Sequence, residues 1–178
     1  MLQYFQILYR PGAVIEELPL NTKDRNFALR VAYLFFMVQS FPFVLNYNLF
    51  GIDSVPLEVL LGGLIGMGVF YLLSLAIVVF SRWFGADAQL LQIQSALGLG
   101  LLPWTLLFIV IYILLTLAPA VAPFLFLLGL IYGFTILLIA LNKVLKISVL
   151  KTYLTFFISM AAVFFPLLMV FKLILGNV

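Results

Sequence analysis

Long apolar runs separated by short polar stretches form the main pattern of the chain. Hydrocarbon about 30 Å thick needs roughly 20 helical residues to cross it, and five runs of about that length are present. The spans that this pattern predicts cover residues 27–45, 56–80, 95–118, 119–141 and 150–175. We therefore expect an all-α integral membrane protein in which five transmembrane helices form one bundle and one domain over residues 1–178.

The boundary between the third and fourth spans depends on two prolines, because no charge lies there. The stretch TLAPAVAPF contains Pro119 and Pro123 among small residues. Prolines four positions apart are poor in a helix interior and favour a turn. We predict a tight helical hairpin at this point, since one unbroken helix over residues 97–141 would be far too long for a single span.

Residues 1–25, ahead of the first run, are predicted to form a short amphipathic segment at the cytoplasmic membrane interface. Leu2, Phe5 and Leu8 share one helical stripe, and Pro11 suits the first turn of a second short helix. Two interpretations are open. The segment is either a surface helix that docks a partner or a tail that packs beneath its own bundle, and we favour the second.

The composition agrees with a membrane protein and narrows its chemistry. Hydrophobic residues make up 66% of the chain and charged residues 8%, whereas about 25% of a soluble domain is charged. The chain contains no Cys and no His, so it lacks thiolate ligands, the usual general base at neutral pH and the commonest metal ligand. We expect no cofactor and no metal.

Acidic residues fall near the predicted span ends, whereas transport or intramembrane catalysis would place them at span centres. Glu16, Glu17, Asp24 and Asp87 fall on the predicted inner side, and Asp53 and Glu58 on the outer side. No two of them have a spacing suited to metal binding or to acid–base work on one helix. We therefore predict no catalytic residues and no enzyme activity.

The basic residues set the predicted orientation, because Lys and Arg near span ends stay on the cytoplasmic side of a membrane. In the five-span topology, Lys172 alone falls on the side opposite the other eight. These cytoplasmic-face residues are Arg10, Lys23, Arg25, Arg30, Arg82, Lys143, Lys146 and Lys151. The N-terminus is therefore predicted inside and the C-terminus outside.

Small residues four positions apart recur in three consecutive spans. Such pairs let two helix backbones approach closely in lipid. The pairs are Gly62 with Gly66, Ala96 with Gly100, and Gly129 with Gly133. We interpret them as an inner packing seam of the bundle, and the alternative is a dimer face on one helix.

Uncharged polar side chains also lie within the spans. They are Gln39, Ser40, Thr105, Thr135, Thr155 and Ser159, together with Tyr71, Tyr112 and Tyr132. These groups either line a polar cavity, or hydrogen-bond across helices at about 0.6 kcal/mol each and back to their own helix. We favour hydrogen bonding within the bundle.

Pro103 lies about two turns into the third predicted span, just after Gly98 and Gly100. Proline inside a helix removes a backbone donor and clashes one turn back. We expect a kink that faces the bundle interior, because in lipid the freed carbonyl must find a neighbour.

Three stretches together resemble the Yip1 domain family, in particular its prokaryotic members. They are the opening YRPGAVIEEL, the loop and third span GADAQLLQIQSALGLGLLPWTLL, and the basic loop and fifth span LNKVLKISVLKTYLTFFI. The resemblance implies five spans, a cytosolic N-terminus and a C-terminus on the far side, here in a prokaryotic cell membrane. The chain departs from many relatives at residues 98–99, where it has Gly-Leu in place of Gly-Tyr, and it lacks the long N-terminal region of eukaryotic members.

The resemblance implies a class of function. Eukaryotic Yip1 relatives are associated with vesicle traffic and small GTPases, but the short tail does not support small-GTPase binding here. We expect a non-enzymatic protein that organises the membrane or scaffolds other membrane proteins. Its expected partners are the lipid bilayer, other membrane proteins or a second copy, and no nucleic acid. The main alternative is a transporter or channel for a lipid or small solute; an enzyme acting on lipid headgroups would have to use Glu16, Glu17 or Asp87.

Overall fold

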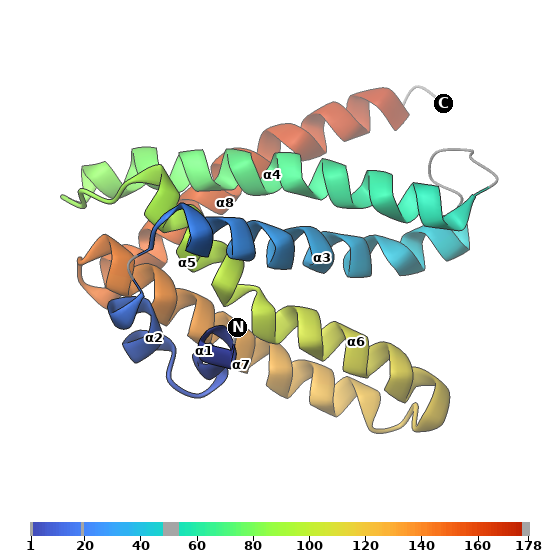
Figure 1. The fold of residues 1–178 in the computed structure, drawn as a ribbon. Coiled ribbons are helices and arrows are strands. Elements are labelled where there is room, and N and C mark those ends of the chain that lie inside the picture. The colour runs from blue at the N-terminus through green and yellow to red at the C-terminus, as the bar shows by residue number, and fades with distance from the viewer. Residues whose placement is uncertain (1, 19, 48–53, 176–178) are drawn as a thin grey trace.

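The computed structural model describes residues 2–18, 20–47 and 54–175, and every regular element in those ranges is helical (Figure 1). The predicted all-α fold is therefore confirmed. The tail contains α1 (Leu2–Phe5), a 3-10 turn η1 (Gln6–Leu8) and α2 (Pro11–Glu17). The bundle contains α3 (Thr22–Tyr47), α4 (Val55–Trp83), α5 (Leu90–Gly100), α6 (Leu102–Leu117), α7 (Ala122–Leu145) and α8 (Val149–Leu175).

Four stretches of the described chain are long and apolar enough to cross a membrane. They are Val55–Trp83, Leu90–Leu117, Ala122–Leu145 and Val149–Val170. The multi-pass prediction is confirmed, but the predicted number of five spans is not. Helix α3, which contains the first predicted span, is not among the four. Over its described residues it is less apolar, because Lys23, Arg25 and Arg30 lie in its first turns.

The third predicted span, 95–118, consists of two helices where one kinked helix was expected. Helix α5 ends at Gly100 and α6 begins at Leu102, with Leu101 between them at φ −80° and ψ −13°. Pro103 occupies the first turn of α6, where its missing N–H costs no helical hydrogen bond, and it is buried. The break therefore precedes the proline, and α5 and α6 meet at an angle (Figure 1).

The predicted helical hairpin between the third and fourth spans is present. A short turn joins α6 to α7, and the Val121 N–H donates to the Ala118 carbonyl at 3.1 Å. Pro119 lies in this turn, whereas Pro123 lies in the first turn of α7. Only one of the two prolines therefore forms the turn, and α7 begins at residue 122 instead of the predicted 119.

Helix α5 lies at the centre of the bundle. All residues from Ile93 to Gly100 are buried, and α5 packs against α3, α4 and α7. Fully buried Ala28, Leu99 and Leu141 belong to one apolar core that also includes tail residues. Helices α3 and α4 run antiparallel side by side, α6 and α7 form the hairpin, and α8 diverges from the bundle toward the C-terminus (Figure 1).

The helix connections gather at two ends of the molecule. The start of α3, the α4–α5 turn and the α7–α8 turn lie at one end, and the α6–α7 turn and the last turns of α8 lie at the other (Figure 1). With α5 and α6 taken as one crossing, successive helices alternate in direction. We call the first end the basic end, because Lys23, Arg82 and Lys143 lie there, whereas Lys172 lies at the other. The loop with Asp53 lies outside the described residues.

The tail packs against the bundle, as the second interpretation of the sequence expects. Helix α2 lies along α7, and Val14 and Ile15 are buried between them and their neighbours. The buried apolar stripe differs from the predicted one, since Phe5 is exposed and Ile7 is fully buried. The reason is the change from α-helix to a 3-10 turn at Gln6, which rotates the side chains that follow.

Candidate functional site

A polar cavity of about 590 Å³ lies at the basic end, between α2, the α4–α5 turn and the end of α7. We call it the basic-end pocket. Its charged lining comes from Glu16, Asp87, Lys143 and Lys146, and Gln92 adds an amide. Two carboxylates and two ammonium groups therefore face one cavity, although they come from three separate parts of the chain.

The floor of the pocket is built by two tight helix ends. Helix α7 ends with Lys146 in the left-handed conformation (φ 53°, ψ 32°), and the Lys146 N–H donates to the Asn142 carbonyl at 2.9 Å. On the other side, Gly85 has a φ of 85°, which favours glycine and turns the chain after α4. Gln89 and Gln92 then form a capping box that starts α5 beside the pocket.

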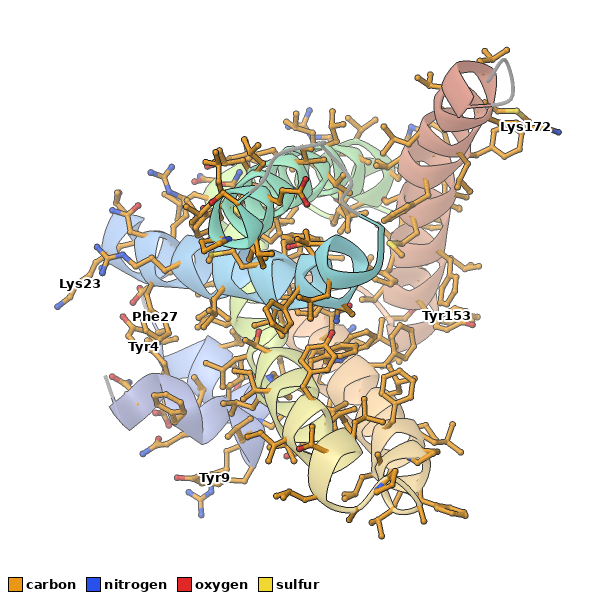
Figure 2. All side chains as sticks on the ribbon, turned by 90° about the vertical axis from the view of Figure 1, so that its right-hand side faces the viewer. Tyr4, Tyr9, Lys23, Phe27, Tyr153 and Lys172 are labelled. Atoms are coloured by element: carbon orange, nitrogen blue, oxygen red, sulfur yellow. The ribbon has the colours of Figure 1, made fainter. Side chains whose placement is uncertain are left out.

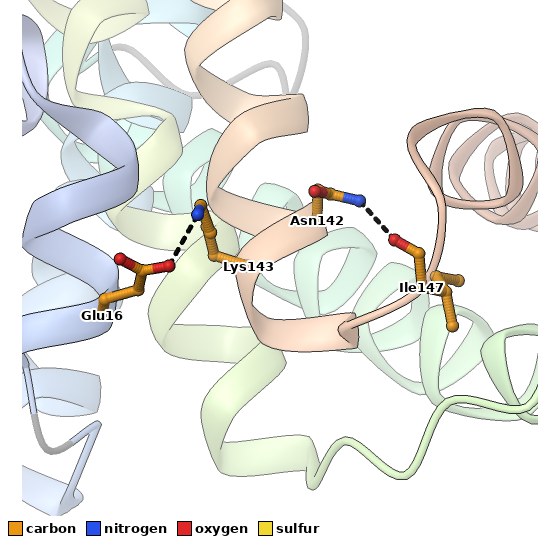
Figure 3. Close-up of polar contacts among 4 residues, drawn as sticks. All are labelled: Glu16, Asn142, Lys143 and Ile147. Atoms are coloured by element: carbon orange, nitrogen blue, oxygen red, sulfur yellow. Dashed lines mark hydrogen bonds and ion pairs between the residues drawn. The ribbon is translucent and has the colours of Figure 1, made fainter.

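An ion pair joins the tail to α7 at the pocket wall (Figure 3). The Lys143 Nζ lies 2.6 Å from the Glu16 Oε1, and the two side chains are 39% and 60% exposed. Gly12 leaves room for the Lys143 side chain, because a Cβ there would lie 3.2 Å from the Lys143 Cε. An ion pair this exposed is worth about 0–1 kcal/mol, so it orients α2 more than it stabilises the fold.

Asn142 fixes the turn between α7 and α8 (Figure 3). Its Nδ2 donates to the Ile147 carbonyl at 2.7 Å and to the Thr152 Oγ1 at 2.9 Å. The interpretation of the sequence did not single out this residue. Its signal is an amide in the last turn of an otherwise apolar helix, where backbone carbonyls lack intrahelical partners.

The chemistry of the pocket is that of charge recognition. Its four ionisable side chains can bind a partner's charges, and none of them is a nucleophile activated by a neighbouring base. Over the described residues, no three His, Cys, Asp or Glu side chains come together where they could hold a metal ion. Of the predicted acidic residues, Glu16 and Asp87 reach the pocket, whereas Asp24, in the first turn of α3, accepts hydrogen bonds from the Tyr4 hydroxyl and the Asn21 N–H.

The eight predicted cytoplasmic-face residues separate into groups. Lys143 and Lys146 line the basic-end pocket, whereas Lys23 and Arg30 line a second cavity between α1 and α3. The others are Arg10, Arg82 and Lys151, which are exposed, and Arg25, which is half-buried. Their common side of the membrane stays a prediction.

The predicted small-residue pairs lie at three separate helix interfaces, so they do not form one seam. Gly62 and Gly66 of α4 face Ser40 and Phe36 of α3. Gly129 and Gly133 of α7 face Leu107 and Trp104 of α6, and in α5 Gly100 faces Leu137 of α7 while Ala96 is fully buried. The two glycine pairs thus belong to separate contacts, α4 with α3 and α7 with α6, and Gly100 belongs to the contact of α5 with α7.

The sequence interpretation missed the role of Gly98. A Cβ on Gly98 would meet the backbone carbonyl of Ala28 in α3, with the carbonyl carbon at 2.7 Å. Gly63 also lies close to α3, but its neighbours are side chains, and a Cβ there would lie 2.7 Å from the Met37 Cγ. Both glycines lie close in sequence to the predicted small-residue pairs. Their spacing alone does not show which helix each glycine faces.

The hydroxyl groups inside the spans are satisfied mainly by their own helices. Thr105 donates to the Leu101 carbonyl at 2.9 Å, and Ser159 donates to the Thr155 carbonyl at 2.7 Å. The same pattern holds for Ser74, Ser95, Thr135 and Thr155. Ser40 also reaches across to the Val59 carbonyl of α4 at 3.3 Å.

An apolar cavity of about 220 Å³ lies within the bundle, where helices α3, α4, α5, α6, α7 and α8 contribute side chains to its wall. Phe36, Phe70, Trp104, Leu137 and Met160 are among its lining residues. Such a lining suits acyl chains and aromatic packing and offers little to a hydrated ion.

Comparison with known proteins gives one match. A protein-family model, the Yip1 domain, matches residues 5–171, which is nearly the whole chain. No curated protein and no solved structure matches the chain.

Proposed function

Because the chain belongs to the Yip1 domain family, we propose that this multi-pass membrane protein organises or scaffolds other membrane proteins and catalyses no reaction. The family match and the apolar helices establish a multi-pass membrane protein. The scaffolding role is the further step. It rests on the hydrogen-bond partners of the polar side chains inside the bundle.

The observation that carries the proposal is the hydrogen bonding of the span hydroxyls. A path for ions or polar solutes needs polar groups turned toward a continuous lumen. Here Thr105, Thr155 and Ser159 donate to carbonyls of their own helices, and the cavity inside the bundle has an apolar lining. This arrangement supports a packed bundle over a transporter.

We assign partner binding to the basic-end pocket. Lys146 and Asp87 are exposed and have no side-chain partner among the described residues, so their charges are available to a second molecule. The partner that suits them is a charged juxtamembrane segment of another membrane protein or of a second copy. A mixed-charge site gives orientation and selectivity more than raw affinity.

We also propose a topology of five spans in a prokaryotic cell membrane, with α3 as the first span. The alternating helix directions and the gathering of basic residues at one end support it, because the more basic side of a membrane protein stays in the cytoplasm. The N-terminus is then inside and the C-terminus outside.

The test places a photo-crosslinking residue at position 146 or 87 in the full-length protein in its native membrane. Position 172 is the matched control, because Lys172 is also an exposed lysine but lies at the opposite end. We expect one discrete cross-linked membrane protein from positions 146 and 87 and none from 172. Lys146→Glu should abolish the Asp87-site adduct, and adducts of equal yield at all three positions would argue against a defined site.

A flux assay tests the alternative function directly. The purified protein in liposomes should pass small solutes and fluorescent lipids no faster than empty liposomes do. Flux well above that background would replace the scaffold proposal with a transporter.

A further inference from the structure

A second polar cavity, of about 710 Å³, lies between the tail and the start of α3. Lys23, Asn26 and Arg30 of α3 line one side, and Gln3 and Tyr4 of the tail line the other. We call it the headgroup pocket. Tyr4, Phe27 and Lys23 mark its position in Figure 2, along the gap between α3 and the tail.

The tail wall of this pocket is held in place by two contacts. The Tyr4 ring stacks on Phe27 with a centroid distance of 4.2 Å and an interplanar angle of 14°. The Tyr4 hydroxyl donates to the Asp24 Oδ1 at 2.8 Å, and the Asn21 N–H donates to the other oxygen at 3.0 Å. The nearby carboxylate is therefore buried and already engaged.

The two cations of the pocket are left with no such partner. Among the described residues, neither the Lys23 ammonium nor the Arg30 guanidinium forms an ion pair or a side-chain hydrogen bond, and both side chains are exposed. Lys23, Asn26 and Arg30 are spaced three and four apart, so they share one face of α3. This face presents two positive charges and an amide to the headgroup pocket.

An apolar groove continues from the headgroup pocket into the bundle surface. Phe27 and Arg30 line both cavities, and the groove, of about 260 Å³, runs between α3 and α6. Phe5, Leu34 and Ile109 are among its walls. A further apolar hollow of about 330 Å³ shares Leu34 and Ile109 with the groove and extends it toward Phe41 and Ile113.

The length of this apolar path matches one leaflet. Arg30 and Phe41 are eleven residues apart on α3, which corresponds to about 16 Å of helix. Half of a hydrocarbon core of about 30 Å is about 15 Å. With α3 as the first span, as proposed above, an acyl chain that starts at Arg30 and follows the groove reaches the middle of the bilayer.

We propose that the headgroup pocket and the groove together form a binding site for one anionic phospholipid. Lys23 and Arg30 bind the phosphate, the side-chain amides of Gln3 and Asn26 contact the polar headgroup, and one acyl chain lies along the groove between α3 and α6. A zwitterionic lipid suits the site less well, because its amine brings a positive charge next to two others. This inference rests on the proposed topology, in which α3 is a span, but not on the scaffolding role.

The test measures lipid retention by native mass spectrometry after the full-length protein is extracted from vesicles of equal parts phosphatidylglycerol and phosphatidylcholine. We expect one phosphatidylglycerol to be retained in preference to phosphatidylcholine. The double variant Lys23→Gln, Arg30→Gln should bind it about 25-fold more weakly, from roughly fivefold for each basic residue near the membrane surface. Arg82→Gln, Lys151→Gln removes the same charge outside the pocket and should retain the lipid.

Two further arms separate a lipid site from a simple phosphate site. Leu34→Trp fills the groove and should weaken retention with the cations intact, while the melting temperature of each variant reports its fold. Soluble glycerophosphoglycerol should fail to displace the lipid at equal concentration. Equal loss in both double variants, equal retention of the two lipids, or displacement by the soluble headgroup would each overturn the proposal.

Discussion

Gly98 of α5 lies directly against the backbone carbonyl of Ala28 in α3. A Cβ on Gly98 would lie 2.7 Å from the Ala28 carbonyl carbon and 2.8 Å from its Cβ. Close backbone approach of this kind strengthens dispersion contacts between helices in lipid. The contact sets how near the central helix lies to α3, whose exposed face carries Lys23 and Arg30.

Gly98→Ala should destabilise the bundle, because the atoms that it would meet belong to backbone. Overpacking of this kind costs about 1–3 kcal/mol. Gly68→Ala is the matched control, because a Cβ there meets nothing within 4 Å and Ala is the better helix former by about 1 kcal/mol. The melting temperature in detergent should fall for Gly98→Ala and rise slightly for Gly68→Ala.

Gly129→Ala adds a graded comparison. Its Cβ would meet the tip of the Leu107 side chain, which can change rotamer, so the change in melting temperature should be smaller than for Gly98→Ala. If Gly98→Ala melts like Gly68→Ala, the α3–α5 contact is looser than the structure has it.

Ile7 should anchor the tail more strongly than the ion pair does. Ile7 is fully buried, so Ile7→Ala should weaken the docking of the tail by about 2–5 kcal/mol. The Lys143–Glu16 pair is largely exposed, so Glu16→Gln should weaken it by only about 0–1 kcal/mol. Hydrogen exchange of the α2 amides measures the difference. A larger increase in exchange for Glu16→Gln than for Ile7→Ala would reverse this ranking.

Tyr4 makes the tail contact sensitive to alkaline pH. Burial, then the hydrogen bond to Asp24, then the Asp24 charge raise the pKa of Tyr4 above its usual 10.0. A raised pKa in the folded state means that this stabilisation is complete below pH 10.0 and is lost as the pH rises through the higher folded pKa. The difference in tyrosinate absorbance between the parent and Tyr4→Phe should report a titration above 10.0.

Asp24→Asn is the control for the cause of this shift. It removes the carboxylate charge, so the pKa of Tyr4 should fall toward 10.0 but stay raised, since burial is the largest cause. A Tyr4 that titrates at or below 10.0 in the parent would mean that the tail is not docked in solution.

The apolar pattern predicts what depends on neighbours along the chain and fails where distant segments meet. Four of the predicted spans overlap apolar helices, because a long hydrophobic run has few other stable forms in lipid. The break at Leu101 was missed, because a proline just after Gly98 and Gly100 fits one kinked helix as well as two separate helices. The basic-end pocket was not predicted: the basic residues indicate that Lys143 and Lys146 share one side of the membrane, but the meeting of Glu16 with Lys143 depends on how the tail folds back.

Cysteine labelling decides whether α3 crosses the membrane. Single cysteines at Lys23 and Ser54 bracket α3 in this cysteine-free chain, and cysteines at Lys146 and Lys172 bracket α8. The cysteines at positions 54 and 172 should react with an impermeant maleimide in intact cells. Those at positions 23 and 146 should react only after permeabilisation, because basic ends stay in the cytoplasm. Labelling of Lys23 and Ser54 from one side, with Lys146 and Lys172 on opposite sides, would establish four spans with α3 lying along the membrane surface.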